Sequence, residues 1–454
     1  MGKEIEALAR FVADTALEQI PHDVQRYAKL VVLDTVGVIL AGAGRPEVRE
    51  LRARLVASAG TGATVQAPGW PASDPRTAAL LNGIAGRAIE LGEGHRYVSY
   101  QGAMQILPGV LAVGEAHRRS GADMLAALIL GYDAGARLGA AMKTRPLAHQ
   151  NGQAALLGAA AAGARLRGLS GVETSLAMRV ATTLVLTPSY NNAVNGATTL
   201  NVAGGMSGVA LGLAPDLALA GFTAQDDAIE EALGSLVGDG FDATGLLDGL
   251  GTRWEITRNW LRLRACCNPI YAALDALEQT VADLAATADQ VERIDVTTFR
   301  FASVMRHPDP PNYFASKYSL PHVAACLVVR GSAGFAAVDD TALNDPAIAG
   351  LRHRVHIAED PAMNPSVPAL KPARVTLVLK DGRTATRSCD SPRGDCLNPY
   401  DPKEIRQKFR ELAGRALTTQ GLDEVERAID GLEHWPSGAV LPSLLRKHGR
   451  ADWR

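Results

Sequence analysis

The chain has 454 residues, of which 47% are hydrophobic, 21% are charged and only 5% are aromatic. An apolar fraction this high excludes a disordered chain, and a net charge of −2 gives no reason to expect nucleic acid or an anionic membrane as a partner. Because domains usually stop growing near about 250–300 residues, the length predicts one large domain with a smaller one, or two domains of similar size.

The first 260 or so residues have the periodicity of helices. Apolar residues recur at positions 5, 8, 11 and 12 until Pro21 ends the segment. Residues 24–40 become apolar all round towards their end, which indicates a central buried helix. Further helices are expected over residues 77–89, 107–116, 122–139, 152–166 and 204–213. Small residues over 158–163 should let helix axes approach closely.

Beyond about residue 270 the pattern changes to short alternating runs. Residues 294–298 and 355–357 alternate apolar with polar. The runs 374–380 and 383–387 flank Asp381-Gly382, a strong hairpin signal. Proline-containing loops are expected at 308–311 and 360–372, and helices return over 403–417, 422–432 and 442–447.

The order of these elements predicts a mainly α protein with a smaller α+β domain. The expected division is a helical domain over 1–265, an inserted α+β lid domain over 266–400, and helices over 401–454 that pack back on the helical domain. No repeat of 20–50 residues stands out, which argues against a solenoid.

The five cysteines, an odd number without a CxxC pair, predict neither a disulfide framework nor a metal or iron–sulfur site. The N-terminal stretch lacks the apolar segment of a signal peptide. The longest apolar run, residues 30–43, is too short to span a membrane and contains Asp34. We therefore expect a cytoplasmic protein without a membrane partner.

Several catalytic signatures are missing: a GxGxxG after a strand, a Walker A loop, HExxH and GxSxG. Candidate sites are therefore sought where polar residues interrupt apolar helices. The segment 90–101 contains Glu90, Glu93, His95 and Gln101, and it is interpreted either as an acid/base cluster or as a solvated turn.

Three further interruptions follow along the chain. His149 precedes an Ala-rich helix, whose dipole would keep a nearby imidazole neutral and fit for a general base; a surface or capping histidine is the alternative. Arg262 and Arg264 alternate in a stretch that looks extended, so they form either a carboxylate clamp or a row of surface arginines. Cys266 and Cys267 beside them are interpreted as buried packing residues. Lys317 lies in an otherwise packed segment and is interpreted as the partner of a buried acid.

These segments, in this order, resemble the MmgE/PrpD family, which includes 2-methylcitrate dehydratases, cis-aconitate decarboxylases and iminodisuccinate epimerases. The resemblance runs from LARFVAD and AKLVVLDTVGVILAG through ALLNGIAGRAIEL and HQNGQAALLGAAAAGARLRGLS to RACCNPIYAALDAL, FASKYSLPHVAA and RGDCLNPYDPKEIRQKFRELA. It implies a helical domain from both chain ends, a small α+β lid, an active site between them, a homodimer, and chemistry without a metal, cluster or nucleotide.

The family's active-site pattern is only partly kept. The segment ELGEGH occupies the position of a DFDDTH-like loop of the family. Glu90 and Glu93 match the first and last carboxylates of that loop, His95 matches its histidine, and Gly94 replaces a threonine. His149 matches a family histidine. A second family histidine corresponds to Gln101. One family lysine corresponds to Ala197 and another to Arg262.

The resemblance therefore implies a lyase of the dehydratase type that removes a proton alpha to a carboxylate of a small carboxylic acid. An epimerase of a small dicarboxylate and a non-catalytic metabolite-binding protein remain alternatives, since one histidine and one lysine of the pattern are missing. We predict His149, as the base, with Glu90, His95 and Gln101 as catalytic residues, and Arg262, Arg264, Glu93 and Lys317 as substrate-binding residues.

Overall fold

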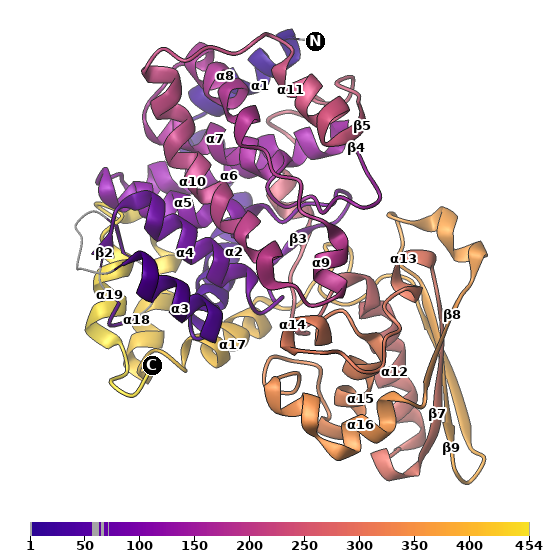
Figure 1. Cartoon of the computed structure of the whole chain (residues 1–454). Helices are drawn as coiled ribbons and strands as arrows, with labels where there is room; N and C mark the ends of the chain where they lie inside the picture. The colour runs from indigo at the N-terminus through magenta and orange to yellow at the C-terminus, as the bar shows by residue number, and fades with distance from the viewer. Residues whose placement is uncertain (1, 57–62, 65–67, 71, 454) are drawn as a thin grey trace.

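The computed structural model describes residues 2–56, 63–64, 68–70 and 72–453. It has a large helical body and a smaller region in which helices cover a sheet, seen at the lower right of Figure 1. The predicted fold class, mainly α with a smaller α+β part, is confirmed.

The helical body is built from the first half of the chain. Its helices are α1 (Gly2–Asp14), α2 (His22–Ala43), α3 (Pro46–Leu55), α4 (Pro75–Arg87), α5 (Gly102–Ala116), α6 (Gly121–Ala141), α7 (Ala154–Leu166), α8 (Gly171–Val180), α9 (Tyr190–Val194), α10 (Asn201–Leu219) and α11 (Ala228–Glu231). Sixteen of the 22 residues of α2 are buried, which confirms the predicted central helix.

Glycines allow the helices of the body to approach closely, as the sequence predicts for residues 158–163. A Cβ added at Gly158 on α7 would lie 2.5 Å from the carbonyl oxygen of Gly131 on α6. A Cβ at Gly163 would collide with the carbonyl of Leu211 on α10. Side chains at these positions would push the helices apart. The close packing of the helices therefore explains both the many small residues and the low aromatic content of the chain.

Two helices extend further than the sequence pattern predicts. Helix α5 begins at Gly102, five residues before the expected start, and continues through Pro108. Helix α10 runs from Asn201 to Leu219 and contains Pro215. Tertiary burial outweighs the local cost of proline here, since thirteen of the fifteen residues of α5 are buried.

The chain's last helices pack on its first ones, as predicted. They are α17 (Pro402–Ala413), α18 (Thr419–Asp430) and α19 (Val440–His448), and α17 and α18 contact α2. Lys408 of α17 pairs with Asp34 of α2 at 2.6 Å, with both side chains buried. One hydrophobic core accordingly joins residues from both chain ends, Ile5 to Leu261 and Tyr400 to Leu445.

The α+β region contains a four-stranded sheet in the order β10-β9-β7-β8. Its strands are β7 (Val291–Thr298), β8 (Val355–Glu359), β9 (Ala373–Leu379) and β10 (Thr384–Cys389). The predicted hairpin is confirmed: β9 and β10 are antiparallel, and Gly382 in the turn has a φ of 88°. Strand β8 runs parallel to β7.

The helices of this region are α12 (Tyr271–Leu284), α13 (Arg300–Ser303), α14 (Tyr313–Ser316), α15 (Leu320–Arg330) and α16 (Pro346–Arg352). Helix α12 contacts β9 and β10, and α15 contacts β8. A second hydrophobic core lies mainly within residues 265–379. The predicted boundaries 1–265, 266–400 and 401–454 stay a prediction.

Among the described residues, six short strands join loops within the helical body. They are β1 (Ala63–Thr64), β2 (Ala72–Ser73), β3 (Gly94–His95), β4 (Met142–Thr144), β5 (Gly238–Phe241) and β6 (Asn259–Trp260). Strand β3 pairs with β6, which brings the segment after α4 beside the segment that contains Arg262. The stretch around Arg262 is extended only over β6, so the predicted alternation of Arg262 and Arg264 on one side of a strand is wrong.

By length and composition alone, α6 and the segment Thr198–Leu219 are each apolar enough to cross a membrane, and the bent pair α2–α3 passes the same test jointly. Within the described residues, 89% of the apolar window of α6 and 50% of that of Thr198–Leu219 are buried in the fold. The hydropathy of α6 is thus that of a core helix. The expected lack of a membrane partner and the cytoplasmic location stay predictions.

Candidate active site

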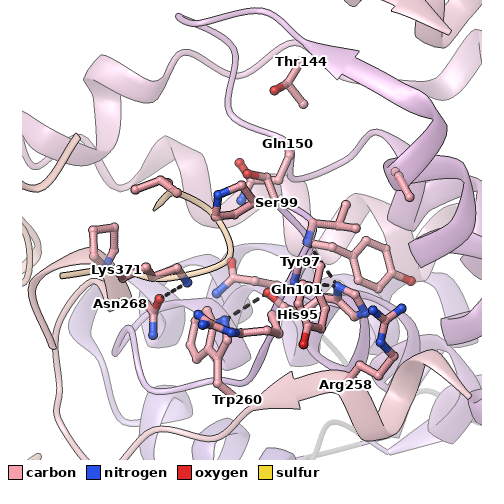
Figure 2. A pocket seen from close by; sticks show the side chains of 18 of the residues that line it. His95, Tyr97, Ser99, Gln101, Thr144, Gln150, Arg258, Trp260, Asn268 and Lys371 are labelled. Carbon is pink, nitrogen blue, oxygen red and sulfur yellow. Dashed lines mark hydrogen bonds between the residues drawn. The ribbon is translucent and has the colours of Figure 1, made fainter. Parts of the chain in front are cut away.

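A cavity of about 560 Å³ lies where the helical body meets the α+β region. The body contributes the loop 95–101 and the segments around His149 and Tyr190, and the α+β region contributes Phe301, Pro368 and Lys371. Figure 2 shows this cavity from close by, with Lys371 and Asn268 on one side and His95, Tyr97 and Arg258 on another. Five of the eight predicted site residues line it: Glu90, His95, Gln101, His149 and Arg262.

Glu90 is held between two guanidinium groups. Its carboxylate lies 3.0 Å from Arg87 and 2.5 Å from Arg262, and all three side chains are buried. Burial alone would raise the pKa of Glu90, but Arg87 and Arg262 outweigh it and lower the pKa to about 2. The residue also has a φ of 52°, uncommon outside glycine and frequent at functional sites. A solvated turn, the alternative interpretation of this segment, is wrong.

Arg87 completes this cluster and was not singled out from the sequence. It lies on α4 three residues before Glu90, so the pair has the spacing of neighbours on a helix, a signal that the sequence did contain. Its Nη1 also donates to Oε1 of Gln101 at 2.9 Å. Gln101, which caps the start of α5, thus presents a neutral amide where the family pattern has a histidine.

His149 is neutral in this pocket. Burial, followed by the charge of Arg87, lowers its pKa to about 3, while Glu90 acts in the opposite direction. The predicted neutrality is therefore right for a different reason, because α7 begins only at Ala154 and the helix dipole is not the main cause. The ring stacks on Tyr190 with centroids 5.5 Å apart and planes 12° from parallel.

The hydrogen bonds of His149 also assign its proton. The backbone N–H of Asn151 donates to Nδ1 at 3.3 Å. Because a backbone N–H can only donate, Nδ1 supplies a lone pair and the proton of the neutral ring is on Nε2. No described residue forms a hydrogen bond with Nε2. His149 therefore offers a ligand an N–H donor rather than the lone pair that the predicted base requires.

His95, by contrast, has both ring nitrogens occupied. Nδ1 accepts from the backbone N–H groups of Tyr97 and Val98, each at 3.2 Å. Nε2 lies 3.0 Å from the carboxylate of Glu255, so it carries the proton and donates it. Arg253 and Arg258 bind the same carboxylate. His95 lines the cavity, yet this arrangement leaves it no free nitrogen for the predicted catalytic role.

Three predicted substrate-binding residues lie outside the cavity lining. Glu93 is buried and accepts hydrogen bonds from the Tyr132 hydroxyl at 2.9 Å and the Ala103 N–H at 2.7 Å. Burial raises its pKa to about 7. These internal partners give Glu93 a structural position beneath the site rather than contact with a ligand.

Arg264 and Lys317 are also turned away from the cavity. Arg264 pairs with Asp275 and Glu278 of α12, so it does not form the predicted clamp with Arg262. Lys317 is buried, donates to the carbonyl oxygen of Val338 and lies 3.9 Å from the ring centre of Tyr313. Its partner is thus a carbonyl rather than the acid that was predicted.

Lys371 is a cavity residue that the sequence did not reveal. Its Nζ donates to Oδ1 of Asn268 at 2.5 Å. Burial, followed by the charge of Arg96, lowers its pKa to about 8. The residue lies in an irregular loop before β9, where no periodicity or motif sets a lysine apart.

All five cysteines are free, as predicted. Burial raises the pKa of Cys267 to about 12 and raises the pKa of Cys266 even more. Both side chains are therefore protonated thiols near neutral pH. This confirms their interpretation as packing residues rather than nucleophiles. Among the described residues, no group of three His, Cys, Asp or Glu side chains is placed to hold a metal ion.

Comparison with known proteins identifies the family. The model of the MmgE/PrpD N-terminal domain matches residues 6–238, and that of the MmgE/PrpD C-terminal domain matches residues 265–433. Similar proteins include the cis-aconitate decarboxylase-like protein oryM of Aspergillus oryzae, 26% identical over 98% of this chain and 97% of the relative. The cis-aconitate decarboxylases of Aspergillus terreus and Mus musculus are each 24% identical, over 96% and 97% of this chain and 95% and 93% of their own lengths. The chain belongs to the MmgE/PrpD family.

Proposed function

We propose that the protein is a lyase acting on a small carboxylic acid, and that its reaction builds negative charge beside a carboxylate of the substrate. The observation that carries this proposal is His149, a neutral imidazole with a free Nε2–H, next to the Arg87–Glu90–Arg262 cluster. The names of the relatives, which are decarboxylases of cis-aconitate, support the same reaction class.

A neutral N–H donor suits such a reaction. When a carbon beside a carboxylate loses a proton or carbon dioxide, an electron pair moves onto an oxygen and forms an enolate. Preorganised donors that face this oxygen stabilise the transition state and need little rearrangement. A histidine kept neutral by its surroundings can polarise the oxygen without giving up its own proton. His149 fits this role, and Arg262 and Arg87 add positive charge nearby.

The tautomer of His149 favours reactions that need a hydrogen-bond donor over reactions that need a base. Dehydration, which the resemblance implies first, and epimerisation both need a base that removes a carbon-bound proton. Decarboxylation breaks a carbon–carbon bond, releases carbon dioxide and needs a donor for the resulting charge. We therefore place decarboxylation first and dehydration second; epimerisation and metabolite binding without catalysis are the other outcomes of the test.

The experiment follows a panel of di- and tricarboxylic acids, including cis-aconitate, in heavy water. Carbon dioxide release with deuterium in the product supports decarboxylation. A change in the absorbance of an unsaturated acid without carbon dioxide indicates dehydration or hydration. Deuterium incorporation with inverted configuration and no net conversion indicates epimerisation. Binding without any of these changes would contradict a catalytic function.

Two further proposals rest on the family resemblance. We propose that the protein is a homodimer and that it acts in the cytoplasm. Sedimentation equilibrium tests the first, and fractionation of the native cells tests the second.

A further inference from the structure

The arginines that line the cavity all have carboxylate partners. The pairs are Arg96–Asp395 at 2.8 Å, Arg137–Asp133 at 2.6 Å, Arg253–Glu255 at 2.8 Å, Arg258–Glu255 at 3.0 Å and Arg262–Glu90 at 2.5 Å. Lys371 differs from them. Across the part of the chain that the structure describes, no carboxylate oxygen lies within 4.0 Å of its Nζ, which makes it the one lining lysine or arginine there without such a partner.

The groups around Lys371 leave its charge uncompensated. Its hydrogen-bond partner is the amide oxygen of Asn268, and its Nζ lies 5.6 Å from the ring centre of Trp260. Both groups attract a cation, but neither carries a negative charge. A partly buried ammonium without an anion is unfavourable, and an anionic ligand in the cavity would compensate it.

The loop that carries Lys371 is fixed over the cavity by a contact with the helical body. Arg96, buried in the body, donates to the carbonyl oxygen of Ala369 at 2.5 Å. The two residues that precede Ala369 in the chain are Val367 and Pro368, and both line the cavity. In Figure 2, Lys371 and Asn268 lie across the cavity from Arg258, with Gln101 between them. Lys371 thus has a defined position on the wall formed by the α+β region.

We propose that Lys371 is a specificity-determining residue: it binds a second carboxylate of the substrate, and the preference for di- or tricarboxylic acids over monocarboxylic acids depends on its charge. This deepens the proposed function and rests on it for the identity of the cavity as the substrate site. The first carboxylate would meet the floor, where Arg87 and Arg262 face the single carboxylate of Glu90. The second positive charge comes from the opposite wall, through Lys371.

Lys371 can also replace a cation that this chain lacks relative to the family pattern. The family pattern has a lysine where this chain has Ala197, which does not line the cavity. Lys371 supplies an ammonium from a different part of the chain, just before β9. A carboxylate site can thus be kept although a cation of the family pattern is missing.

The test compares two acids of nearly the same shape that differ in one carboxylate. Maleate and isocrotonate both have a cis double bond, and a methyl group in isocrotonate replaces one carboxylate; cis-aconitate is the third probe. Calorimetry measures their binding to the wild type, Lys371→Met, Lys371→Arg and the control Lys380→Met. Lys380 is an exposed lysine at the end of β9, outside the cavity.

We expect the wild type to prefer maleate or cis-aconitate over isocrotonate by about tenfold or more, the usual effect of a charged hydrogen bond. Lys371→Met should lose this preference, whereas Lys371→Arg, which keeps the charge, and Lys380→Met should retain it. A wild type that binds none of the probes, or binds all equally, overturns the proposal. Loss of the preference in Lys371→Arg as complete as in Lys371→Met also overturns it, since it indicates a role that needs a neutral amine.

The pH dependence of the preference is a second readout. The ammonium is present below the pKa of about 8 and is lost above it, so the preference of the wild type should fall as the pH rises through 8. The charged or titratable groups that act on Lys371 are Arg96, Asp395, Cys267 and Arg262. In Lys371→Arg the preference should stay constant over this range, and an equal decline there would assign the effect to one of these neighbours. Because the readout is binding, absence of turnover would contradict the proposed function and leave the role of Lys371 standing.

Discussion

The cavity contains two clusters built from the same residue types, a histidine, a glutamate and two arginines, and the two differ in what they leave free. In the first, His95 has both nitrogens bonded and Glu255 binds His95, Arg253 and Arg258. In the second, Glu90 binds Arg87 and Arg262, and the neighbouring His149 keeps Nε2 available.

The difference shows that residue type alone does not identify a catalytic group. A histidine whose two nitrogens are fixed by the protein stabilises the fold, because any reaction at it must first break those bonds. A histidine with one fixed nitrogen has a defined tautomer and a free atom for the substrate. His95 and His149 thus have opposite expected responses to substitution.

Glu90→Gln should have the largest effect on stability. It leaves Arg87 and Arg262 buried without a carboxylate, and removal of one partner from a buried ion pair costs about 3–5 kcal/mol. Urea denaturation measures the free energy of unfolding. Glu50→Gln, which removes an exposed helical pair with Arg54, is the control and should change it by less than about 0.5 kcal/mol. Equal effects of the two substitutions would contradict the assigned role of Glu90.

His149→Ala should lower kcat/KM by about 10²–10³-fold, the usual cost of removing a donor that stabilises a developing oxyanion. Steady-state kinetics measures the change, with circular dichroism to show that the fold is kept. A decrease of only a few-fold would exclude His149 from catalysis.

His149→Gln sharpens the distinction between donor and base. Glutamine has an N–H group but no basic nitrogen, so a donor role predicts partial retention of kcat/KM relative to His149→Ala. If the two variants are equally inactive, the original prediction of a base regains support.

His95→Ala should show the opposite pattern. The loss of hydrogen bonds to Glu255 and to the Tyr97 and Val98 amides should lower the free energy of unfolding by about 1–3 kcal/mol. Below the unfolding transition, kcat/KM should stay within a few-fold of the wild type. Thermal unfolding and kinetics on the same preparation measure the stability and kcat/KM. A large decrease in kcat/KM without a loss of stability would contradict a purely structural role of His95.

Glu93→Gln should act on the pH dependence of stability and leave catalysis unchanged. Burial raises the pKa of Glu93 from 4.5 to about 7, so the folded protein keeps a proton that the unfolded chain releases. The free energy of unfolding should therefore fall as the pH rises from 4.5 to 7, by about 3 kcal/mol. In Glu93→Gln this decline should be absent. Denaturation at pH 5 and pH 8 gives the comparison, and an unchanged difference would show that Glu93 ionises normally.

Much of the fold was predictable because its signals are local. Apolar periodicity located the long helices, and Asp381-Gly382 between alternating runs located the hairpin. The start of α5 was missed because burial, rather than propensity, extends the helix back to Gly102. The family pattern correctly led to Glu90, His149 and Arg262 as cavity residues.

The sequence by itself determined which residue types are available: the neutral amide at Gln101, the missing lysine at Ala197 and the cysteines without a pairing pattern. The tertiary structure alone decided how they are used. It fixed the proton of His149 on Nε2, turned Arg264 towards α12 and brought Lys371 to the cavity. The physical reason is that burial and hydrogen-bond partners set the charge and the free atoms of a side chain, and those partners come from segments far apart in the chain.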